Sequence, residues 1–418
     1  MICLIEALNY RCLRYIQQPL SSFHILVGPN ASGKTTFLDV VAFLGQLVSD
    51  GLETAITKNR TENFHDLLWN GEGTRFELAI EATIPPEKVK TQKKQFDTIR
   101  YEIAVGINKN SGELGIIEER ALLKKWKEKN TRQRNVFPAE STPPSTIMSG
   151  KAKPGERTVL CKNINGNDNF YSENQEESGK GWYPSIRLGP RKSTLASLHE
   201  DESRFPASTW LKGLLTQGVQ TFVLNSLAIK RASPPGKNHK FLSDGSNLPW
   251  VIEEMRSRDK KRFKDWINHI KTALPDISDI KTVERPDDKH RYLAIKYQGG
   301  LEVPSWMVSD GTLRFLALTL PAYLSEFKGV YLIEEPENGI HPRALEQVLQ
   351  SLSSVYDAQI LLATHSPIIL SLAKLDDVLC FRKTDSGATD IISGKQHPDL
   401  KNWRGEPNLS VIFASGVL

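Results

Sequence analysis

The amino-acid sequence predicts an α/β fold with a mostly parallel sheet, an antiparallel β lobe and an inserted helical lobe. Apolar strand patterns alternate with helical ones around residues 23–47 and again after residue 290. Between these regions, residues 75–125 show the period-two alternation of antiparallel strands, and residues 193–275 show helical periodicity. Because alternating strands and helices form parallel sheets covered by helices, we expect the core at the two ends of the chain and the lobes between them.

The composition is typical of a water-soluble protein with roughly two to four domains. The 418 residues are 39% hydrophobic and 25% charged, and no apolar run approaches the ~18 residues that a membrane span needs. Glu6 follows the N-terminus too closely for a secretory signal, so we expect a cytoplasmic protein with no membrane partner. The four cysteines form no CxxC pair, which argues against a zinc ribbon or a disulfide framework.

The patterns divide the chain into four predicted segments. Residues 1–74 form the first part of the core, residues 75–192 the antiparallel lobe, residues 193–289 the helical lobe and residues 290–418 the second part of the core. Within the antiparallel lobe, residues 126–182 are rich in Ser, Asn, Gly and Pro and poor in apolar anchors. This composition predicts a flexible insertion.

A glycine-rich loop joins the strand expected at residues 23–27 to the helix that follows. It matches the pattern GxxxxGK[ST], in which glycines let backbone N–H groups point at phosphate oxygens and the helix N-terminus adds a partial positive charge. Lys34 is expected to reach the β- and γ-phosphates, and the Thr35 hydroxyl to coordinate Mg²⁺. The predicted phosphate-binding residues are Gly28, Pro29, Asn30, Ala31, Ser32, Gly33, Lys34, Thr35 and Thr36.

Two adjacent carboxylates follow the apolar strand expected at residues 330–333. Glu334 and Glu335 stand at the carboxyl end of a strand, where α/β folds bind ligands. The two carboxylates suit two different roles. Glu334 is expected to belong to the magnesium shell, and Glu335 to polarise the attacking water as a general base. Paired glutamates after a strand are usually a solvated edge, but the phosphate loop upstream favours the catalytic interpretation.

Two further segments are interpreted together with these motifs. His365 follows the apolar strand expected at residues 360–363. A lone histidine there is usually a core or cap residue, but its place beyond the carboxylate strand favours a sensor of the γ-phosphate. In the second segment, Ser309 or Asp310 is the expected N-cap of an apolar helix, and Gly311 lets the backbone approach an anion closely.

Together these segments resemble the ABC-type ATPase heads of the SMC, RecF and OLD families, over residues 1–60 and 290–418 with gaps. Asn9-Tyr10-Arg11 looks like the turn after an early strand whose arginine approaches the nucleotide in SMC-like heads. The family's other motifs fall at Gly28–Thr35 (Walker A), Ser309–Thr312 (a divergent signature motif), Leu332–Glu335 (Walker B), Glu337–Gly339 (D-loop) and His365 (switch histidine).

The resemblance implies an ATPase that uses ATP and Mg²⁺ and forms a homodimer or a higher homo-oligomer when it binds ATP. In such heads, the signature residues complete the ATP site of a second copy. The catalytic residues would be Lys34, Glu335 and His365, and the signature residues Ser309, Asp310, Gly311 and Thr312.

The sequence departs from the family pattern at two positions. Glu334 stands where SMC proteins usually carry Asp, and Asp310 replaces a glycine beside the partner copy's phosphate. The first departure is common in the OLD-like subgroup, whose Glu-Glu-Pro-Glu-Asn-Gly-Ile-His-Pro segment this chain shows at residues 334–342. No Q-loop glutamine is assigned. Because of these departures, a scaffold that binds ATP and hydrolyses it slowly stays an alternative function.

The length of the chain bears on its partners. The 300 residues between Lys34 and Glu334 are more than a transporter ATPase needs, and the 38 residues after Cys380 are too few for the nuclease domain of OLD proteins. The resemblance therefore implies a stand-alone head that controls a separately encoded effector, a nuclease or a toxin, in prokaryotic anti-phage defence. A DNA-repair ATPase of the RecF type stays open as an alternative.

Basic charge is concentrated in the expected insertion. The whole chain has a net charge of +5, and residues 124–163 contain ten Lys and Arg against three Glu. These basic residues lie among Trp126, Phe137 and Ser/Pro segments, a combination that can follow a phosphate backbone. A solvated loop explains them equally well, so DNA stays an open candidate partner.

Overall fold

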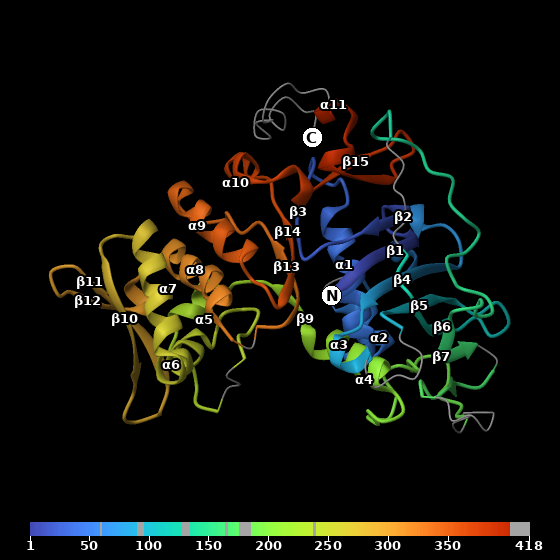
Figure 1. Ribbon diagram of the computed structural model, residues 1–418, viewed down its shortest axis with the longest axis horizontal. Helices are drawn as coiled ribbons and strands as arrows, with labels where there is room; N and C mark the ends of the chain where they lie inside the picture. Colours follow the sequence, from blue (N-terminus) through green and yellow to red (C-terminus); the bar gives the residue numbers. More distant parts are fainter. Residues whose placement is uncertain are drawn as a thin grey trace. The chain divides into compact units, whose positions relative to one another are not determined.

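The computed structural model divides the chain into two compact units (Figure 1). Of the described residues, the first unit contains 1–219 and 375–401, and the second contains 220–374. The Walker A segment therefore lies in the first unit, and the signature, Walker B and switch segments lie in the second. The structure describes residues 1–58, 61–89, 96–127, 134–163, 166–174, 185–236, 240–325 and 327–401.

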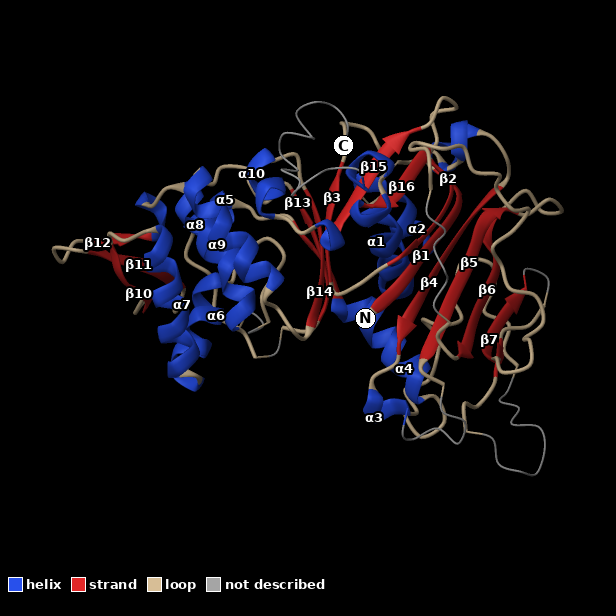
Figure 2. Cartoon of the chain, turned by 45° about the horizontal axis from the view of Figure 1, so that its top comes forward, coloured by secondary structure: helices blue, strands red, loops and turns tan. Residues whose placement is uncertain are grey.

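An antiparallel sheet forms most of the first unit, and its strands run side by side in Figure 2. The strand order is β2-β1-β4-β5-β6-β7-β8. The strands predicted at residues 76–80 and 101–105 lie in β4 and β5, which pair with each other antiparallel as expected. The bounds are β1 (Ile2–Tyr10), β2 (Leu13–Pro19), β4 (Arg75–Thr83), β5 (Thr98–Ile107), β6 (Leu114–Lys124), β7 (Arg157–Asn163) and β8 (Asn169–Phe170).

The helix α1 (Lys34–Asp50) lies between this sheet and three further strands of the first unit. Phe43 of α1 contacts Phe76 of β4 with ring centroids 5.5 Å apart, and Phe37 contacts Phe381 of β15 at the same distance. β3 (Phe23–Val27) pairs parallel with β15 (Val378–Lys383), which pairs antiparallel with β16 (Thr389–Ser393). The shorter elements are α2 (Leu52–Thr57), η1 (Phe64–Leu67), η2 (Trp69–Gly71), α3 (Pro86–Val89), α4 (Pro206–Gly213), η3 (Leu214–Gly218), η6 (Leu375–Asp377), η7 (Gly394–Gln396) and α11 (Pro398–Lys401).

The second unit combines a parallel strand pair, a small antiparallel sheet and packed helices. β13 (Gly329–Glu334) pairs parallel with β14 (Ala358–Ala363). The indole of the buried Trp266 in α7 donates to the hydroxyl of Thr319 in α8 at 3.1 Å. The other elements are β9 (Val219–Phe222), which starts at the unit boundary, α5 (Ser226–Lys230), α6 (Leu248–Arg258), α7 (Lys260–Ala273), β10 (Ile277–Glu284), β11 (Arg291–Tyr297), β12 (Glu302–Pro304), η4 (Ser305–Met307), α8 (Asp310–Thr319), η5 (Leu320–Tyr323), α9 (Pro342–Ser353) and α10 (Pro367–Leu372). The predicted α/β class is therefore confirmed.

The expected flexible insertion at residues 126–182 needs a correction in its described part. It contains β7 and β8, and Phe137, Ile147 and Met148 are buried within it. The composition did not reveal them because Ile147 packs against Leu8 and Ala79, and Phe137 against His397, which lie far away in the sequence. Of this insertion, residues 128–133, 164–165 and 175–182 lie outside the described residues.

None of the described helices combines the length and the apolar character that crossing a lipid bilayer requires.

Candidate functional site

The Walker A loop connects a fully buried strand, β3, to α1. The loop follows the path that only a glycine-rich sequence adopts readily, because Gly28 and Gly33 have φ values of 153° and 103°. Ala31 also takes a positive φ of 60°. Among the described residues no side chain caps α1, whose N-cap is Gly33. The first backbone N–H groups of α1 are therefore not used by a side-chain cap, which is the arrangement that binds anions.

The loop is packed against the β15–β16 hairpin from one side. A Cβ atom on Gly28 would lie 2.2 Å from the carbonyl oxygen of Phe381, and one on Gly33 would lie 2.3 Å from Oγ1 of Thr389. The Thr389 hydroxyl also donates to the carbonyl oxygen of Ser32 at 2.9 Å. Both glycines are thus required by close packing as well as by their φ values. The sequence analysis missed Thr389, because nothing near it in the chain relates it to the loop.

Lys34 is buried at the mouth of the loop. Its ammonium group donates to the carbonyl oxygens of Gly28 at 2.8 Å and of Pro29 at 2.9 Å. The Ser32 hydroxyl is buried and has no hydrogen-bond partner among the described residues. Thr35 is exposed in the first turn of α1. A cation and the buried Ser32 hydroxyl therefore lie in the loop, and both are groups that can bind a phosphate.

Arg11 lies beside α1, as its assignment to the site requires. Its guanidinium is 3.6 Å from the carboxylate of Asp39, to which the Tyr10 hydroxyl also donates at 2.5 Å. The Arg11 backbone has a positive φ of 50°, and its N–H donates to the carbonyl oxygen of Leu67 at 2.9 Å. The turn between β1 and β2 is thereby fixed on the helix that starts with Lys34.

In the second unit, the two predicted carboxylates leave the end of β13. Glu334 and Glu335 are both exposed, and Glu335 has a φ of 47°. The Glu335 N–H donates to the carbonyl oxygen of Ala363 at 2.8 Å, and the Asn338 amide donates to the Glu335 carboxylate at 2.5 Å. A left-handed conformation at a non-glycine residue, held by two hydrogen bonds, is typical of functional sites.

Glu337 joins the carboxylate loop to the switch segment within the second unit. One of its carboxylate oxygens accepts from the Thr364 hydroxyl at 2.7 Å and from the N–H of His365 at 3.0 Å. Its other oxygen is buried without a hydrogen-bond partner among the described residues. The structure therefore brings His365 to the loop that carries Glu334 and Glu335. Sequence reasoning assigned Glu337 only to the D-loop and missed this role.

The signature segment begins α8, and Ser309 is its N-cap. The Ser309 hydroxyl accepts from the N–H of Thr312 at 3.2 Å and lies 2.8 Å from the Thr312 hydroxyl. Asp310, the other N-cap candidate, instead forms an ion pair with Lys230. A Cβ atom on Gly311 would lie 2.3 Å from the carbonyl oxygen of Gly339, so this glycine is required for packing on the D-loop segment.

Arg314 fixes the signature helix to the D-loop segment and was also missed by the sequence analysis. Its guanidinium donates to the carbonyl oxygens of Asn338 at 3.0 Å and Leu224 at 3.3 Å and to the Ser226 hydroxyl at 3.1 Å. A charged residue inside an apolar helix is the only signal of this role in the sequence. The signature, D-loop and carboxylate segments are therefore joined within one unit.

Magnesium ligands were expected at Thr35 and Glu334. A hydroxyl and a carboxylate are oxygen donors of the kind that Mg²⁺ prefers, so the chemistry of each side chain, taken by itself, suits the expected ion. Within the described residues, no three His, Cys, Asp or Glu side chains gather into a metal centre of their own.

Comparisons with known proteins show the family and the fold of the chain. A family model described as "AAA domain, putative AbiEii toxin, Type IV TA system" (AAA_21) matches residues 23–371. The chain belongs to the AAA_21 family. The "Retron Vc95 probable ATPase" of Vibrio cholerae serotype O1 biovar El Tor is 21% identical to this AAA_21 member over 406 residues, which cover 90% of this chain and 72% of that protein.

Two solved structures show which fold this AAA_21 chain has. An SMC head bound to the C-terminal winged-helix domain of ScpA superimposes with a TM-score of 0.54 and 13% identity, covering 94% of this chain and 97% of that one. An SMC head of Pyrococcus furiosus with an extended coiled coil, bound to the C-terminal domain of ScpA, gives a TM-score of 0.51 and 12% identity over 94% and 96%. The fold is that of an SMC head, and the predicted resemblance is confirmed.

Proposed function

We propose that the protein binds and hydrolyses ATP. The observation that carries this proposal is the Walker A loop, in which glycine backbones, the first amides of α1 and the buried ammonium of Lys34 surround one position suited to phosphate. Membership of the AAA_21 family supports the same conclusion.

The proposed mechanism assigns one task to each group. The amides of residues 31–36 and Lys34 bind the β- and γ-phosphates, and Glu335 accepts the proton of the attacking water. Thr35 and Glu334 would hold Mg²⁺, which supplies positive charge to the triphosphate when bound. His365, fixed by its N–H bond to Glu337, contacts the γ-phosphate. Arg11 approaches the nucleotide from the turn beside Asp39.

Nucleotide binding is tested with Lys34→Ala. Because this change removes the ammonium from the loop, we expect ATP binding to be almost lost in equilibrium titrations with Mg²⁺ and ATP. Lys58→Ala, an exposed lysine in the same unit, is the matched control and should bind like the wild type. Equal ATP affinity in Lys34→Ala and the wild type would contradict the proposed phosphate site.

We further propose that ATP joins two copies of the chain. In ABC-type heads the signature helix completes the ATP site of a second copy, so Ser309 and Gly311 would meet the γ-phosphate bound to the partner's loop. The side-chain and packing contacts that fix α8 to the D-loop segment support a signature helix that moves with the catalytic carboxylates.

A mixing experiment tests the shared site. Lys34→Ala and Ser309→Arg should each be nearly inactive, but their heterodimer keeps one site with an intact loop and an intact signature helix. Equal mixing should recover up to roughly a quarter of the wild-type rate if the sites act independently. Activity that averages the two variants, in protein shown by mass to have exchanged subunits, would exclude the shared site.

The proposed biological role is ATP-dependent control of a separately encoded effector in prokaryotic defence. The name of the Vibrio relative, a retron ATPase, and the toxin–antitoxin wording of the family description support this role. The test is phage challenge of cells that carry the chain and its neighbouring gene, with Lys34→Ala as the inactive control. Protection that does not depend on Lys34 would contradict ATP-dependent control.

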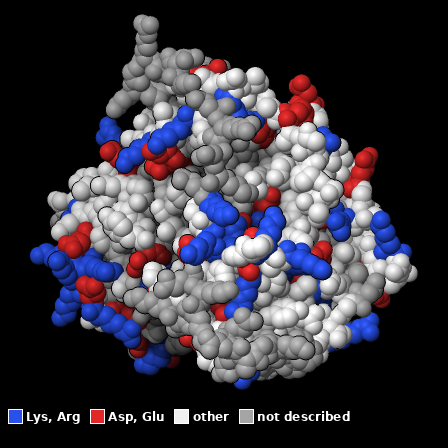
Figure 3. Space-filling model, turned by 45° about the vertical axis from the view of Figure 1, so that its right-hand side comes forward, with Lys and Arg blue, Asp and Glu red and all other residues white. Residues whose placement is uncertain are grey.

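The RecF-type alternative predicts direct DNA binding. Lys125, Lys127, Lys151 and Lys153 are exposed. In Figure 3, Lys and Arg side chains gather near the middle of the face that is shown, with a few acidic side chains beside them. Replacing the four lysines by Gln should flatten the dependence of log K on log salt if they contact phosphates. An unchanged slope would leave them as solvated side chains.

A slowly hydrolysing scaffold is the third alternative. Asp310 is engaged by Lys230, and Glu334 is one methylene longer than the Asp that SMC proteins usually carry, and either feature can slow hydrolysis. Steady-state turnover with and without DNA separates this scaffold from the other two functions, since only the scaffold would bind ATP without sustained turnover.

A further inference from the structure

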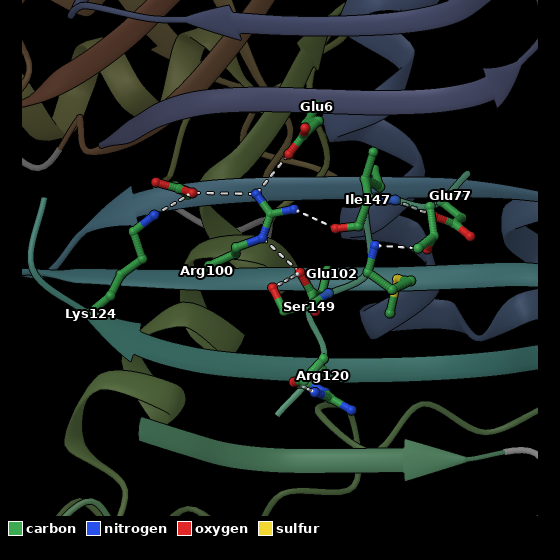
Figure 4. A network of polar contacts seen from close by, with 12 residues as sticks. Glu6, Glu77, Arg100, Glu102, Arg120, Lys124, Ile147 and Ser149 are labelled. Atoms are coloured by element: carbon green, nitrogen blue, oxygen red, sulfur yellow. Dashed lines mark hydrogen bonds and ion pairs between the residues drawn. The ribbon is translucent and has the colours of Figure 1, made fainter. Parts of the chain in front are cut away.

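Residues 134–150 form a strap that connects two parts of the first unit. One end of the strap lies against the β15–β16 hairpin, and the other end lies on the antiparallel sheet, where Figure 4 shows its contacts. The strap belongs to the insertion at residues 126–182, which the sequence predicted to be flexible. Its contacts at both ends involve charged side chains.

On the sheet, buried charged side chains bind the backbone of the strap. Glu77 accepts from the N–H of Ile147 at 2.7 Å, and Glu102 accepts from the N–H of Ser149 at 2.6 Å. The Arg100 guanidinium donates to the carbonyl oxygen of Ile147 at 2.9 Å. Because Glu77, Arg100 and Glu102 are at most 7% exposed, loss of these bonds would leave buried charged groups with fewer partners, which is unfavourable. The sheet thus fixes this end of the strap.

At the hairpin, the strap binds Asp390 of β16. Arg134 forms a two-pronged ion pair with the Asp390 carboxylate, which also accepts from the N–H of Ala139 at 2.8 Å. Glu140 accepts from the N–H of Ser386 at 3.0 Å in the turn of the hairpin. Two acidic side chains, one on each partner, therefore hold the strap and the hairpin together.

The residue before Asp390 reaches the Walker A loop. The Thr389 hydroxyl donates to the carbonyl oxygen of Ser32 at 2.9 Å, while its N–H donates to the carbonyl oxygen of Cys12 at 2.9 Å. A trans peptide group is planar, so its C=O and N–H point in opposite directions. By holding the Ser32 carbonyl toward β16, Thr389 directs the N–H of Gly33 away from β16.

We propose that the strap controls the phosphate-binding geometry of the Walker A loop through Asp390 and Thr389, and that Thr389 is a positioning residue for this loop. The proposal rests on the proposed ATP binding. The antiparallel lobe is then a regulatory element, because a partner that displaces the strap from Asp390 also changes the orientation of the peptide group between Ser32 and Gly33.

Matched variants separate this coupling from a general loss of structure. Thr389→Val keeps the shape of the side chain but removes its donor, and Thr389→Ser keeps the hydroxyl. Arg134→Gln breaks the ion pair with Asp390, and Lys151→Gln makes the same charge change at an exposed lysine just beyond the strap. The measurements are the Kd and KM for ATP, kcat, and amide hydrogen exchange of residues 28–36 without nucleotide.

We expect Thr389→Val to weaken ATP binding by about 2- to 10-fold, the effect of one lost hydrogen bond, with kcat nearly unchanged. Arg134→Gln should also weaken ATP binding. The double variant should weaken it by a smaller factor than the product of the two single factors, because both substitutions act on the same chain of contacts. Amide exchange in the loop should be faster in both variants. Thr389→Ser and Lys151→Gln should behave like the wild type.

Wild-type affinity and unchanged loop exchange in Thr389→Val and Arg134→Gln would overturn the proposal. A wild-type protein that binds no ATP would instead overturn the proposed function. The exchange measurement needs no nucleotide, so even then faster exchange in both variants would support the coupling and unchanged exchange would refute it.

Discussion

The Walker A loop in the first unit and the carboxylate loop in the second are held in place by different means. The first loop packs closely on its neighbours, since Gly28 and Gly33 leave no room for a Cβ atom beside β15 and β16. The second loop is held by side-chain hydrogen bonds, from Asn338 to Glu335 and from Arg314 to Asn338. Each such bond contributes about 1 kcal/mol, and the close packing of Gly311 on the carbonyl oxygen of Gly339 adds to them. The carboxylate loop therefore depends on side chains that a single substitution can remove, whereas the Walker A loop has no room for a side chain at its two glycines.

The largest expected effect concerns Glu335 in the carboxylate loop. Glu335→Gln should lower the rate of ATP hydrolysis by ~10²–10⁴, because an amide cannot act as the general base, while leaving ATP binding largely intact. Single-turnover hydrolysis and equilibrium binding are the measurements. Glu346→Gln, an exposed glutamate on α9, is the matched control and should have no effect. Hydrolysis at the wild-type rate in Glu335→Gln would show that the base has been misassigned.

The next prediction tests close packing in the second unit. Gly311→Ala would place a Cβ atom 2.3 Å from the carbonyl oxygen of Gly339, and the forced shift should lower the free energy of unfolding by about 1–3 kcal/mol. Gly213→Ala is the contrast, because Gly213 is helical with open space around its Cβ position, and it should raise stability by about 0.5–1 kcal/mol. Urea unfolding measures both changes. Equal effects at the two glycines would contradict the packing of α8 on the D-loop segment.

A pH-dependent prediction concerns His24, on the strand that leads into the Walker A loop. Burial lowers the pKa of His24 to about 4, and its ring is placed to accept from the N–H of Ser21 at 2.8 Å as a neutral group. Because the unfolded histidine binds protons more tightly, stability falls as the pH drops from about 6.5 toward 4. The loss at pH 5 should be about 1–2 kcal/mol relative to pH 7.5.

Urea unfolding at several pH values checks this effect, with His24→Gln as the comparison. The variant should be less stable overall but should lose less stability between pH 7.5 and pH 5. Parallel pH curves for the two proteins would exclude His24 as the group responsible. The measurement bears on the first loop alone, since His24 belongs to the strand that leads into it.

The sequence predicted the local parts of this site and missed the parts that depend on distant contacts. The order of strand, glycine loop and helix around Lys34 is visible because it occupies one continuous stretch with clear periodicity. Thr389 and Ser32 are 357 positions apart in the sequence, and no local pattern predicts their contact. β10 was missed inside the expected helical lobe, where its buried residues are separated by polar ones.

The same distinction explains the residues that join the second unit. Arg314 and Glu337 stand next to recognised motifs, but their roles depend on the carbonyl oxygen of Asn338 and on the N–H of His365. Backbone groups are present at every position and carry no sequence signal. Whether Arg11 or Ser309 approaches a nucleotide stays a prediction.

The smallest expected effect compares the N-termini of the two functional helices. α8 has a side-chain cap, because Ser309 accepts from the N–H of Thr312, whereas α1 has Gly33 as its N-cap and no side-chain cap among the described residues. Ser309→Ala should therefore lower the free energy of unfolding by about 0.5–2 kcal/mol, and Ser309→Thr should lose much less because it keeps the hydroxyl. Urea unfolding without nucleotide measures both. If Ser309→Ala unfolds like the wild type, the cap contributes nothing and the helix end is as open as that of α1. If the loss is as expected, a phosphate that binds there must compete with the Ser309 hydroxyl for the same N–H, which makes the signature helix the weaker of the two anion sites.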